Sequence, residues 1–274
     1  MGRAKINLPE GQLRNLYLKR NFSTFKIAKL FGCNPITIAN RLREYGIKLR
    51  DKAHMRNFYK KQPFSGSALE RAYLVGFRLG DLNVYKPFKN SIILVARCHT
   101  TIQEQARLIK SLFCKYGGVK IAHSQNGFTI NCFLDTSFDF LLTKSLPHDI
   151  FAKQSSAISF TAGYTDAEGS FGLNQGRGRF QIASYDYQIL KNINQFLEKN
   201  GIKTKFKLIA KKGSSRENDG RWNNNLWRLN VNEAASLEKF IKRLLPYMKH
   251  KKRISDALIV LKNIDKRRID GTIK

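Results

Sequence analysis

The chain contains few acidic residues. It has 20 Asp and Glu against 50 Lys and Arg among 274 residues, so its formal net charge is +30. A partner that brings phosphate groups would neutralise this excess, and nucleic acid is therefore the leading candidate. An anionic membrane surface is the other partner that the charge alone allows.

Long apolar runs are also missing. No segment approaches the ~18 consecutive apolar residues that a transmembrane helix needs. The first ten residues, MGRAKINLPE, lack the apolar core of a signal peptide and the hydroxyl residue of a myristoylation site. We therefore expect no membrane association and an intracellular location, in the cytoplasm, the nucleoid or an organelle matrix, rather than secretion.

Cysteine is scarce and scattered. No two of the cysteines form a close pair of the kind that zinc sites and redox motifs use. We expect all of them to pack in the core in a reducing compartment. They are Cys33, Cys98, Cys114 and Cys132.

Residues 23–50 have the apolar spacing of two short helices joined at Gly32, which is typical of a helix-turn-helix. The polar side of the second helix carries Asn40, Arg41 and Arg43, side chains that reach bases and phosphates in such motifs. A small bundle with a solvated basic face is the alternative. The apolar positions expected in the first helix are Phe25, Ile27, Ala28, Leu30 and Phe31.

An internal repeat with an offset of 87 positions begins near residue 69. Small residues recur at every fourth position of a predicted helix in each copy, which clears a stripe along which two helices can approach closely. The offset relates Ala72, Gly76, Gly80 and Asp81 to Ser159, Gly163, Ala167 and Glu168. A repeat that occurs only twice at so long a period indicates duplicated half-domains rather than a solenoid.

Each repeated helix is followed by strand, strand, helix, strand, strand and helix. The expected fold class is therefore α+β, with two pseudo-symmetric αββαββα half-domains after a small helical module. Residues 51–68 are polar, basic and broken by Pro63 and Gly66, which is typical of a linker. The predicted domains are a helix-turn-helix module at 1–50, a linker at 51–68, and half-domains at 69–153 and 154–274.

Asp81 and Glu168 end the two repeated helices and would lie close together if those helices pack. A carboxylate is disfavoured at the negative end of a helix, and two neighbouring carboxylates repel each other. A divalent cation would compensate both, with the carbonyls of Gly80 and Ala167 as further hard oxygen ligands. The sequence therefore predicts a Mg²⁺ site, although each acid could instead be a solvated turn residue.

The segments YLVGFRLGDLNV and FTAGYTDAEGSF resemble the two motifs of a single-chain LAGLIDADG homing endonuclease. The resemblance implies that Asp81 and Glu168 bind the catalytic metal. Leu79 stands where the first motif usually has an earlier acid, whereas the second motif keeps Asp166. Glu168 is one methylene longer than Asp81, which makes the two metal positions unequal.

The same resemblance implies a basic active-site residue at Lys251, five residues after a proline, and a counterpart at Lys153 in the first repeat. Such an ammonium would stabilise charge near the scissile phosphate. His99 and Tyr185 fall where the family often carries a water-orienting side chain, although neither is the usual residue. A tail of solvated lysines is the alternative for Lys251.

Strand alternation predicts where DNA binds. One face of the predicted strands collects cations and amides, which contact phosphates and base edges, whereas apolar residues alternate with them. In the second repeat these are Arg179, Gln181, Lys203, Lys205, Lys207, Arg228 and Asn230. The first repeat offers Arg97 and Lys120 with Asn83, Tyr85, Thr129 and Asn131. For each single residue, a solvated polar sheet face is the alternative.

The resemblance implies a monomer that makes a double-strand break in a long double-stranded DNA target and leaves short 3′ overhangs. The two sheets would form a DNA-binding saddle. Two other functions remain open: an intron-encoded RNA maturase that binds its own intron RNA, and a LAGLIDADG-derived DNA-binding regulator that does not cut. Retention of both acids argues against the regulator.

Overall fold

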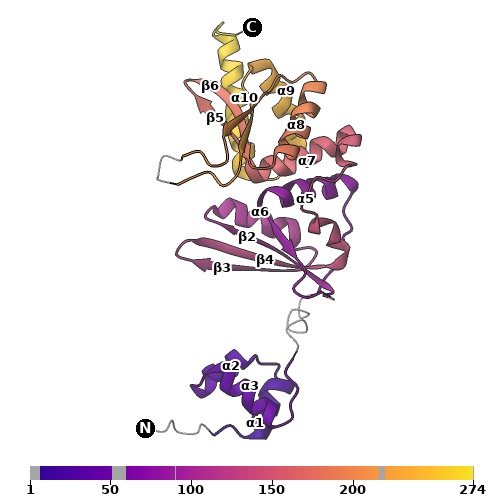
Figure 1. Ribbon diagram of the computed structural model, residues 1–274, viewed down its shortest axis with the longest axis vertical. Coiled ribbons are helices and arrows are strands. Elements are labelled where there is room, and N and C mark those ends of the chain that lie inside the picture. Colours follow the sequence, from indigo (N-terminus) through magenta and orange to yellow (C-terminus); the bar gives the residue numbers. More distant parts are fainter. Residues whose placement is uncertain (1–6, 51–59, 90, 216–219, 274) are drawn as a thin grey trace. The chain divides into compact units, whose positions relative to one another are not determined.

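The computed structural model describes residues 7–50, 60–89, 91–215 and 220–273. The chain divides into two compact units, residues 1–58 and 59–274 (Figure 1). Part of the predicted linker, residues 51–59, lies outside the described residues. The finer domain boundaries remain predictions.

The first unit is helical. Its second and third α-helices begin at capping side chains, because Ser23 Oγ accepts from the Lys26 amide at 3.1 Å and Asn34 Oδ1 accepts from the Ile36 amide at 2.9 Å. Gly32, between these helices, has a φ of +61°, which favours glycine. The elements are α1 (Glu10–Arg14), the π-helical turn η1 (Asn15–Lys19), α2 (Thr24–Phe31) and α3 (Pro35–Glu44).

The apolar face predicted for α2 is only partly buried. Ile27 and Ala28 are buried in the core of the first unit, but Phe25 is 73% exposed and Leu30 is 61% exposed. All five apolar residues expected in this helix lie in α2, but Phe25 and Leu30 are on its exposed side. Each residue turns an α-helix by about 100°, so Phe25 and Leu30 each lie about 110° around the helix from the midpoint between the buried Ile27 and Ala28.

The second unit contains the two predicted half-domains, and the α+β class is confirmed. The first half consists of α5 (Ala68–Asp81), β1 (Asn83–Tyr85), β2 (Ile93–Thr100), α6 (Gln103–Phe113), β3 (Gly118–Ser124), β4 (Gly127–Asp135), and the 3-10 helices η2 (Thr136–Leu142) and η3 (Ile150–Ala152). The second half consists of α7 (Gln154–Glu168), β5 (Gly169–Asn174), β6 (Arg177–Ser184), α8 (Tyr187–Lys199), β7 (Lys205–Ala210), β8 (Leu226–Val231), α9 (Ala234–Leu244), η4 (Leu245–Tyr247) and α10 (Lys251–Ile269).

Each half contains a four-stranded antiparallel sheet with the same connectivity. The strand orders are β1-β2-β4-β3 and β5-β6-β8-β7. The halves differ at their last helix, because the segment predicted as a helix after β4 forms the 3-10 helix η2, whereas α9 is an α-helix. Helices cover one face of each sheet (Figure 1).

Helices α5 and α7 lie side by side between the two sheets (Figure 1). An ideal Cβ on Gly76 would lie 2.2 Å from the Phe160 carbonyl oxygen, and one on Gly163 would lie 2.0 Å from the Tyr73 carbonyl oxygen. Such distances leave no room for a side chain, so the two backbones touch. The small residues predicted to line this contact therefore do so.

The cysteines are all free thiols. Cys98 and Cys132 are buried and Cys33 is half-buried, as predicted for core residues, but Cys114 is exposed. Cys114 directly follows α6, beyond the last buried turn of that helix. In the described part of the chain, no helix has the length and apolar character needed to cross a membrane.

Candidate functional site

The helix pair ends in two carboxylates. Asp81 is the last residue of α5 and Glu168 is the last residue of α7. An ideal Cβ on Gly80 would lie 2.4 Å from the Ala167 Cβ and 3.1 Å from the Glu168 Cγ. The ends of the two helices are therefore in contact, and the two acids are neighbours.

Burial determines the electrostatics of both acids. It raises the pKa of Asp81 to about 6, while the nearby Arg253 guanidinium acts in the opposite direction. Burial and, secondly, the charge of Asp81 raise the pKa of Glu168 to about 7. The ionised forms are thus poorly compensated by the protein, and an added cation would stabilise them.

The oxygen atoms near these acids suit a hard divalent cation. Gln105 of α6 donates through Nε2 to Asp81 Oδ2, and its Oε1 is buried without a hydrogen-bond partner among the described residues. Carboxylate, amide and carbonyl oxygens are the ligands that Mg²⁺ accepts. No group of three His, Cys, Asp or Glu that could hold a metal occurs in the described residues. Backbone carbonyls, water or phosphate would therefore complete the coordination.

Asp166 has a structural role that its first-repeat counterpart cannot perform. It is fully buried, and its Oδ2 accepts hydrogen bonds from the Tyr73 hydroxyl at 2.7 Å, the Lys249 amide at 2.6 Å and the His250 amide at 3.0 Å. These bonds join α7 to α5 and to the segment that starts α10. Leu79 instead packs partly buried against the core, so the two motifs differ because only one of them anchors a following helix.

Arg253 was missed by the sequence reasoning. Its Nε donates to the Asp166 carbonyl oxygen at 2.8 Å, and its Nη2 donates to the Ala167 carbonyl oxygen at 2.6 Å. Burial lowers its pKa, against the opposing charges of Asp166, Asp81 and Glu168. The basic run at the start of α10 indicated that a cation would lie near the acids, but the sequence alone did not indicate which one.

Lys251 is the first residue of α10 and is exposed. It lines a small pocket of about 200 Å³ together with Lys249 and with Glu104 and Arg107 of α6. Lys251 and Arg253 are two positions apart on one helix, so they point about 200° apart around its axis. Arg253 is the one of these two that contacts the end of α7.

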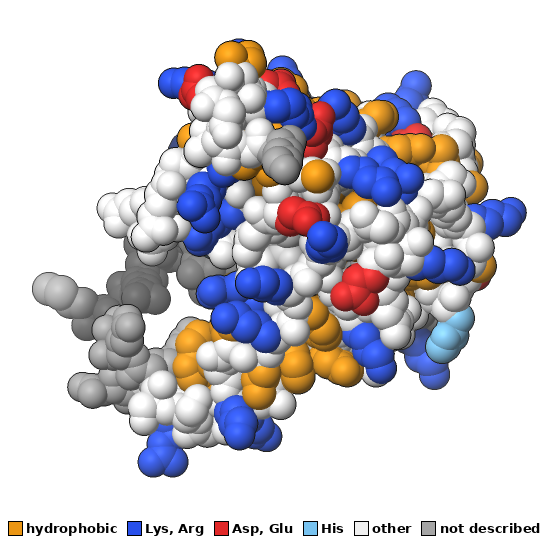
Figure 2. Space-filling model, turned by 90° about the horizontal axis from the view of Figure 1, so that it is seen from above, with side chains coloured by type: hydrophobic (Ala, Val, Ile, Leu, Met, Phe, Trp, Pro, Cys, Tyr) orange, Lys and Arg blue, Asp and Glu red, His pale blue; other side chains and the backbone are white. Residues whose placement is uncertain are grey.

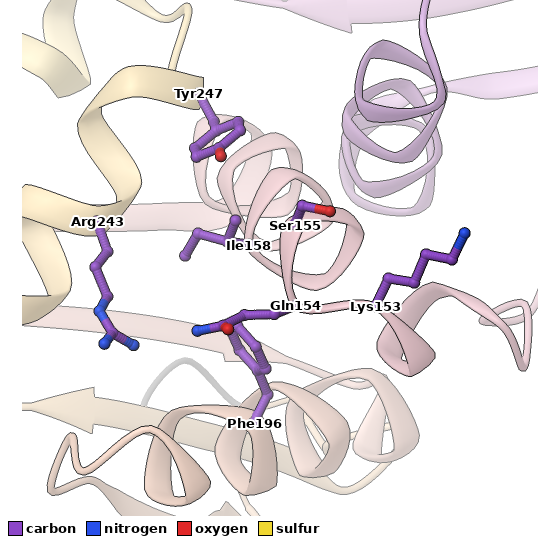
Figure 3. Close-up of a pocket in the computed structure, with 7 residues that line it drawn as sticks. All are labelled: Lys153, Gln154, Ser155, Ile158, Phe196, Arg243 and Tyr247. Atoms are coloured by element: carbon purple, nitrogen blue, oxygen red, sulfur yellow. The ribbon is translucent and has the colours of Figure 1, made fainter.

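Lys153 lies far from the acids. It precedes α7 as its N-cap, and Glu168 ends that helix of 15 residues, so about 20 Å of helix separates the two positions. Lys153 lines a pocket of about 670 Å³ with Phe196, Arg243 and Tyr247. In Figure 3 its side chain points away from Arg243. The structure does not bring Lys153 to the carboxylates.

A polar row crosses the outer face of the first sheet. Arg97 of β2 lies opposite Asn83 of β1 and Asn131 of β4, and Asn131 lies opposite Lys120 of β3. The side chain of Arg97 is exposed and makes no hydrogen bond with any described residue. Four of the predicted residues therefore share one row, whereas Tyr85, opposite Val95, and Thr129, opposite His99, lie in neighbouring rows.

The second sheet repeats this row. Gln181 of β6 lies opposite Ser170 of β5 and Asn230 of β8, and Asn230 lies opposite Lys205 of β7. Gln181 therefore corresponds to Arg97, because each occupies the second position of a row that crosses four strands in the same order. Asn230 and Lys205 likewise correspond to Asn131 and Lys120.

The remaining predicted cations of the second sheet lie in neighbouring rows, with one exception. Arg179 is paired with Gly172, and Lys207 is paired with Arg228. Lys203 precedes β7, which begins at Lys205, and its Nζ forms an ion pair of 2.6 Å with Glu233. The strand predicted to include Lys203 was too long, and its ammonium is held at the start of α9.

His99 and Tyr185 are both at or just beyond strand ends. His99 is exposed on β2, and its Nδ1 lies 3.1 Å from Thr129 Oγ1. Tyr185 follows β6 and is 50% exposed. The buried amide that contacts a candidate metal ligand is Gln105, which lies on α6 rather than on a strand. Nothing in the sequence around Gln105, in the first turn of α6, indicated that it would contact Asp81.

The first unit presents its predicted cations on α3. Arg41 forms an ion pair of 2.7 Å with Glu44, and Arg43 donates to Asn40 Oδ1 at 2.7 Å. Both contacts join near neighbours on the surface of the helix, so breaking them to contact a ligand would cost little free energy.

Figure 2 shows that Lys and Arg are much more frequent than Asp and Glu on the face of the molecule in view.

One segment of the chain matches the model of a known protein family. Residues 156–244 match the model of the LAGLIDADG-like domain. This segment contains Asp166 and Glu168 at the end of α7, together with the second sheet. This part of the chain is therefore similar to a LAGLIDADG-like domain. No curated protein matches the chain significantly.

Solved structures provide further similarities at low identity. The homing endonuclease I-DmoI in complex with DNA and Ca is 17% identical, with a TM-score of 0.47 over 65% of this chain and 90% of that chain. I-DmoI has also been solved with DNA and Mn, and that structure is 17% identical with a TM-score of 0.45 over 67% of this chain and 98% of that chain. Full-length DUF199/WhiA from Thermatoga maritima is 15% identical, with a TM-score of 0.48 over 79% of this chain and 65% of that chain. These values are too low to assign an activity to this chain.

Proposed function

We propose that this chain is a site-specific, metal-dependent DNA endonuclease that makes a double-strand break. The observation that carries the proposal is the contact between the ends of α5 and α7, which makes the half-buried Asp81 and Glu168 neighbours. Neither acid forms an ion pair with a described residue, and half-buried carboxylates without such a pair are costly to keep for stability alone. Binding of a catalytic metal would explain why both acids are present at this position.

The residues of the chain would have the following roles in metal binding. Asp81 and Glu168 bind the metal, with the Gly80 and Ala167 carbonyls as candidate backbone ligands. Gln105 fixes the orientation of Asp81 through its hydrogen bond. When bound, Mg²⁺ supplies charge stabilisation at the scissile phosphate and an activated water. Hydrolysis of both strands across the minor groove would leave short 3′ overhangs.

The outer faces of the two sheets are the proposed DNA surface. Each has a row of polar side chains across four strands, most of them amides or cations, and this chemistry suits base edges and phosphates. The basic α3 of the first unit would add contacts to the same duplex. The formal net charge of +30 would supply the non-specific part of the affinity.

The test is a cleavage assay on a selected target. Duplexes that bind the full-length protein are recovered from a random library in EDTA, and the recovered duplexes are then incubated with Mg²⁺. We expect cleavage of both strands with short 3′ overhangs, and no cleavage while EDTA is present. Sequence-specific binding without any cleavage in Mg²⁺ or Mn²⁺ would instead indicate a DNA-binding regulator.

The corresponding positions Arg97 and Gln181 lead to a prediction about the target. Arg pairs with guanine through two hydrogen bonds, whereas Gln pairs with adenine. We expect Arg97→Gln to change the preferred base at one target position from G to A, with a discrimination of about tenfold or more. Binding-site selection with the wild type and the variant measures this change.

Arg107→Gln is the matched control, because Arg107 is exposed on α6 rather than on the sheet face. It should lower the overall affinity slightly at low salt and leave the base preference unchanged. An identical selected sequence for wild type and Arg97→Gln would contradict the assignment of Arg97 to base recognition.

A further inference from the structure

A cavity of about 670 Å³ lies at the start of α7, on the helix side of the second sheet. Its walls come from α7, α8, α9 and η4, and α8 and α9 pack against β8 and β6 of that sheet. The length of α7, about 20 Å, separates this cavity from Glu168. The proposed DNA surface is the outer face of the same sheet, so the cavity is not part of it.

Asn200, the C-cap of α8, holds two polar side chains of the cavity wall. Its Oδ1 accepts from Gln154 Nε2 of α7 and from Arg243 Nη1 of α9, each at 2.8 Å. Its own Nδ2 donates to the Phe196 carbonyl oxygen at 2.8 Å. One amide therefore joins three helices and positions Gln154 and Arg243 in advance of a ligand, which lowers the entropic cost of binding.

Arg243 brings an uncompensated positive charge to the cavity. It is half-buried, and it forms no ion pair and no ring contact with any residue that the structure describes. No Asp or Glu occurs among the described residues that line the cavity. Asn200 uses one of the guanidinium N–H groups, so the others remain available to an anion, and phosphate suits their fixed geometry.

The first half-domain has a different arrangement at the corresponding place. The offset of 87 positions relates Ile158, which lines the cavity, to Arg71 of α5. The Arg71 guanidinium lies 4.7 Å from the ring centroid of Phe140, so a cation and an aromatic ring satisfy each other there. That cavity, of about 430 Å³, is also lined by Asp149. In the second half the cation lacks both kinds of partner.

Aromatic rings form two walls of the cavity. Phe196 and Tyr247 are half-buried, and Figure 3 shows both directed toward the space that Arg243 borders. Phe196 is supported by an edge-to-face contact with Phe151, with ring centroids 5.9 Å apart. Tyr247 makes no ring contact with a described residue. A planar base stacks well on such rings, and Gln154 Oε1 remains an acceptor for a base edge.

We propose that this cavity binds a nucleotide whose base is unpaired, with its phosphate on Arg243 and its base against Phe196 and Tyr247. The volume is in the range that small-molecule sites occupy. A free nucleotide and an unpaired nucleotide of a single strand share this chemistry, and the test distinguishes them. Neither the acid pair nor the duplex surface takes part, so the site is independent of the proposed endonuclease function.

The test is binding of AMP, GMP, CMP and UMP to the full-length protein in EDTA, measured by isothermal titration calorimetry. Arg243→Met removes the phosphate contact, and Tyr247→Leu removes a stacking wall without removing a hydrogen bond to a described residue. We expect each variant to bind the preferred nucleotide about tenfold more weakly or worse. Lys242→Met is the matched control, because Lys242 is an exposed cation on the same helix and pairs with Glu238 at 2.6 Å. Its affinity should stay within about twofold of the wild type.

Inorganic phosphate and a short single-stranded oligonucleotide are the further probes. Tighter binding of the oligonucleotide, lost in both variants, would identify a nucleotide within a strand, whereas equal or weaker binding would identify a free nucleotide. Phosphate that binds as tightly as the nucleotides, equal losses in Lys242→Met and Arg243→Met, or no binding of any nucleotide probe would overturn the proposal. If Arg243→Met does not fold, Tyr247→Leu against Lys242→Met decides the same question.

Discussion

Glu168→Gln is expected to abolish DNA cleavage while DNA binding is retained. The substitution keeps the length of the side chain but replaces a negatively charged carboxylate with a neutral amide, which is a much weaker ligand for a divalent metal. Loss of metal assistance removes several kcal/mol of transition-state stabilisation, which corresponds to a rate decrease on the order of 10³-fold or more. Single-turnover cleavage of the selected duplex, together with an equilibrium binding assay, measures both effects.

The matched control is Glu198→Gln, an exposed glutamate on α8 whose carboxylate accepts a hydrogen bond from Thr204 at 3.1 Å. It makes the same chemical change away from the acid pair and should cleave at the wild-type rate. Burial raises the pKa of Glu168, so the variant should not lose stability in EDTA. Full cleavage activity in Glu168→Gln would show that Glu168 is not a metal ligand.

Gly163→Ala is expected to have the largest effect on stability. The added Cβ would lie 2.0 Å from the Tyr73 carbonyl oxygen and 3.0 Å from the Phe77 amide nitrogen. Both atoms belong to the backbone of α5 and cannot rotate away, so the two helices must separate. We expect a loss of about 3 kcal/mol or more in the free energy of unfolding, measured by urea denaturation.

Gly172→Ala is the control for this substitution. Gly172 lies on β5, and no atom lies within 4 Å of an ideal Cβ at this position. Its effect should therefore stay within about 1 kcal/mol. Because separation of α5 from α7 also separates Asp81 from Glu168, any folded Gly163→Ala protein should cleave DNA more slowly. An unchanged urea midpoint would contradict the close backbone contact.

The helix contact could be predicted from the sequence because its cause is local. Gly76 and Gly163 are related by the repeat offset of 87 positions. Small residues at every fourth position of a helix have few uses other than close packing against another helix. Strand alternation likewise predicted the faces of the sheets, since successive side chains must point to opposite sides. These patterns are properties of neighbouring residues and need no knowledge of the fold.

Lys251, Arg253 and Gln105 show where that reasoning stops. A run of cations at the start of a helix contains several candidates, and only the packing of α10 against α7 selects Arg253. Gln105 reaches Asp81 from α6, across 24 positions of sequence that include two strands. Such contacts depend on the angle between packed elements, which sequence spacing does not encode.

The sequence by itself therefore determined the duplicated α+β architecture, the glycine stripe, the two acids at the helix ends and the strongly basic surface. The tertiary structure alone decided which cation meets those acids, removed Lys153 from their neighbourhood and aligned Arg97 with Gln181 in corresponding rows. The reason is physical: periodicity along the chain fixes which side of an element a residue occupies, whereas the approach of one element to another is decided by the packing of all of them together.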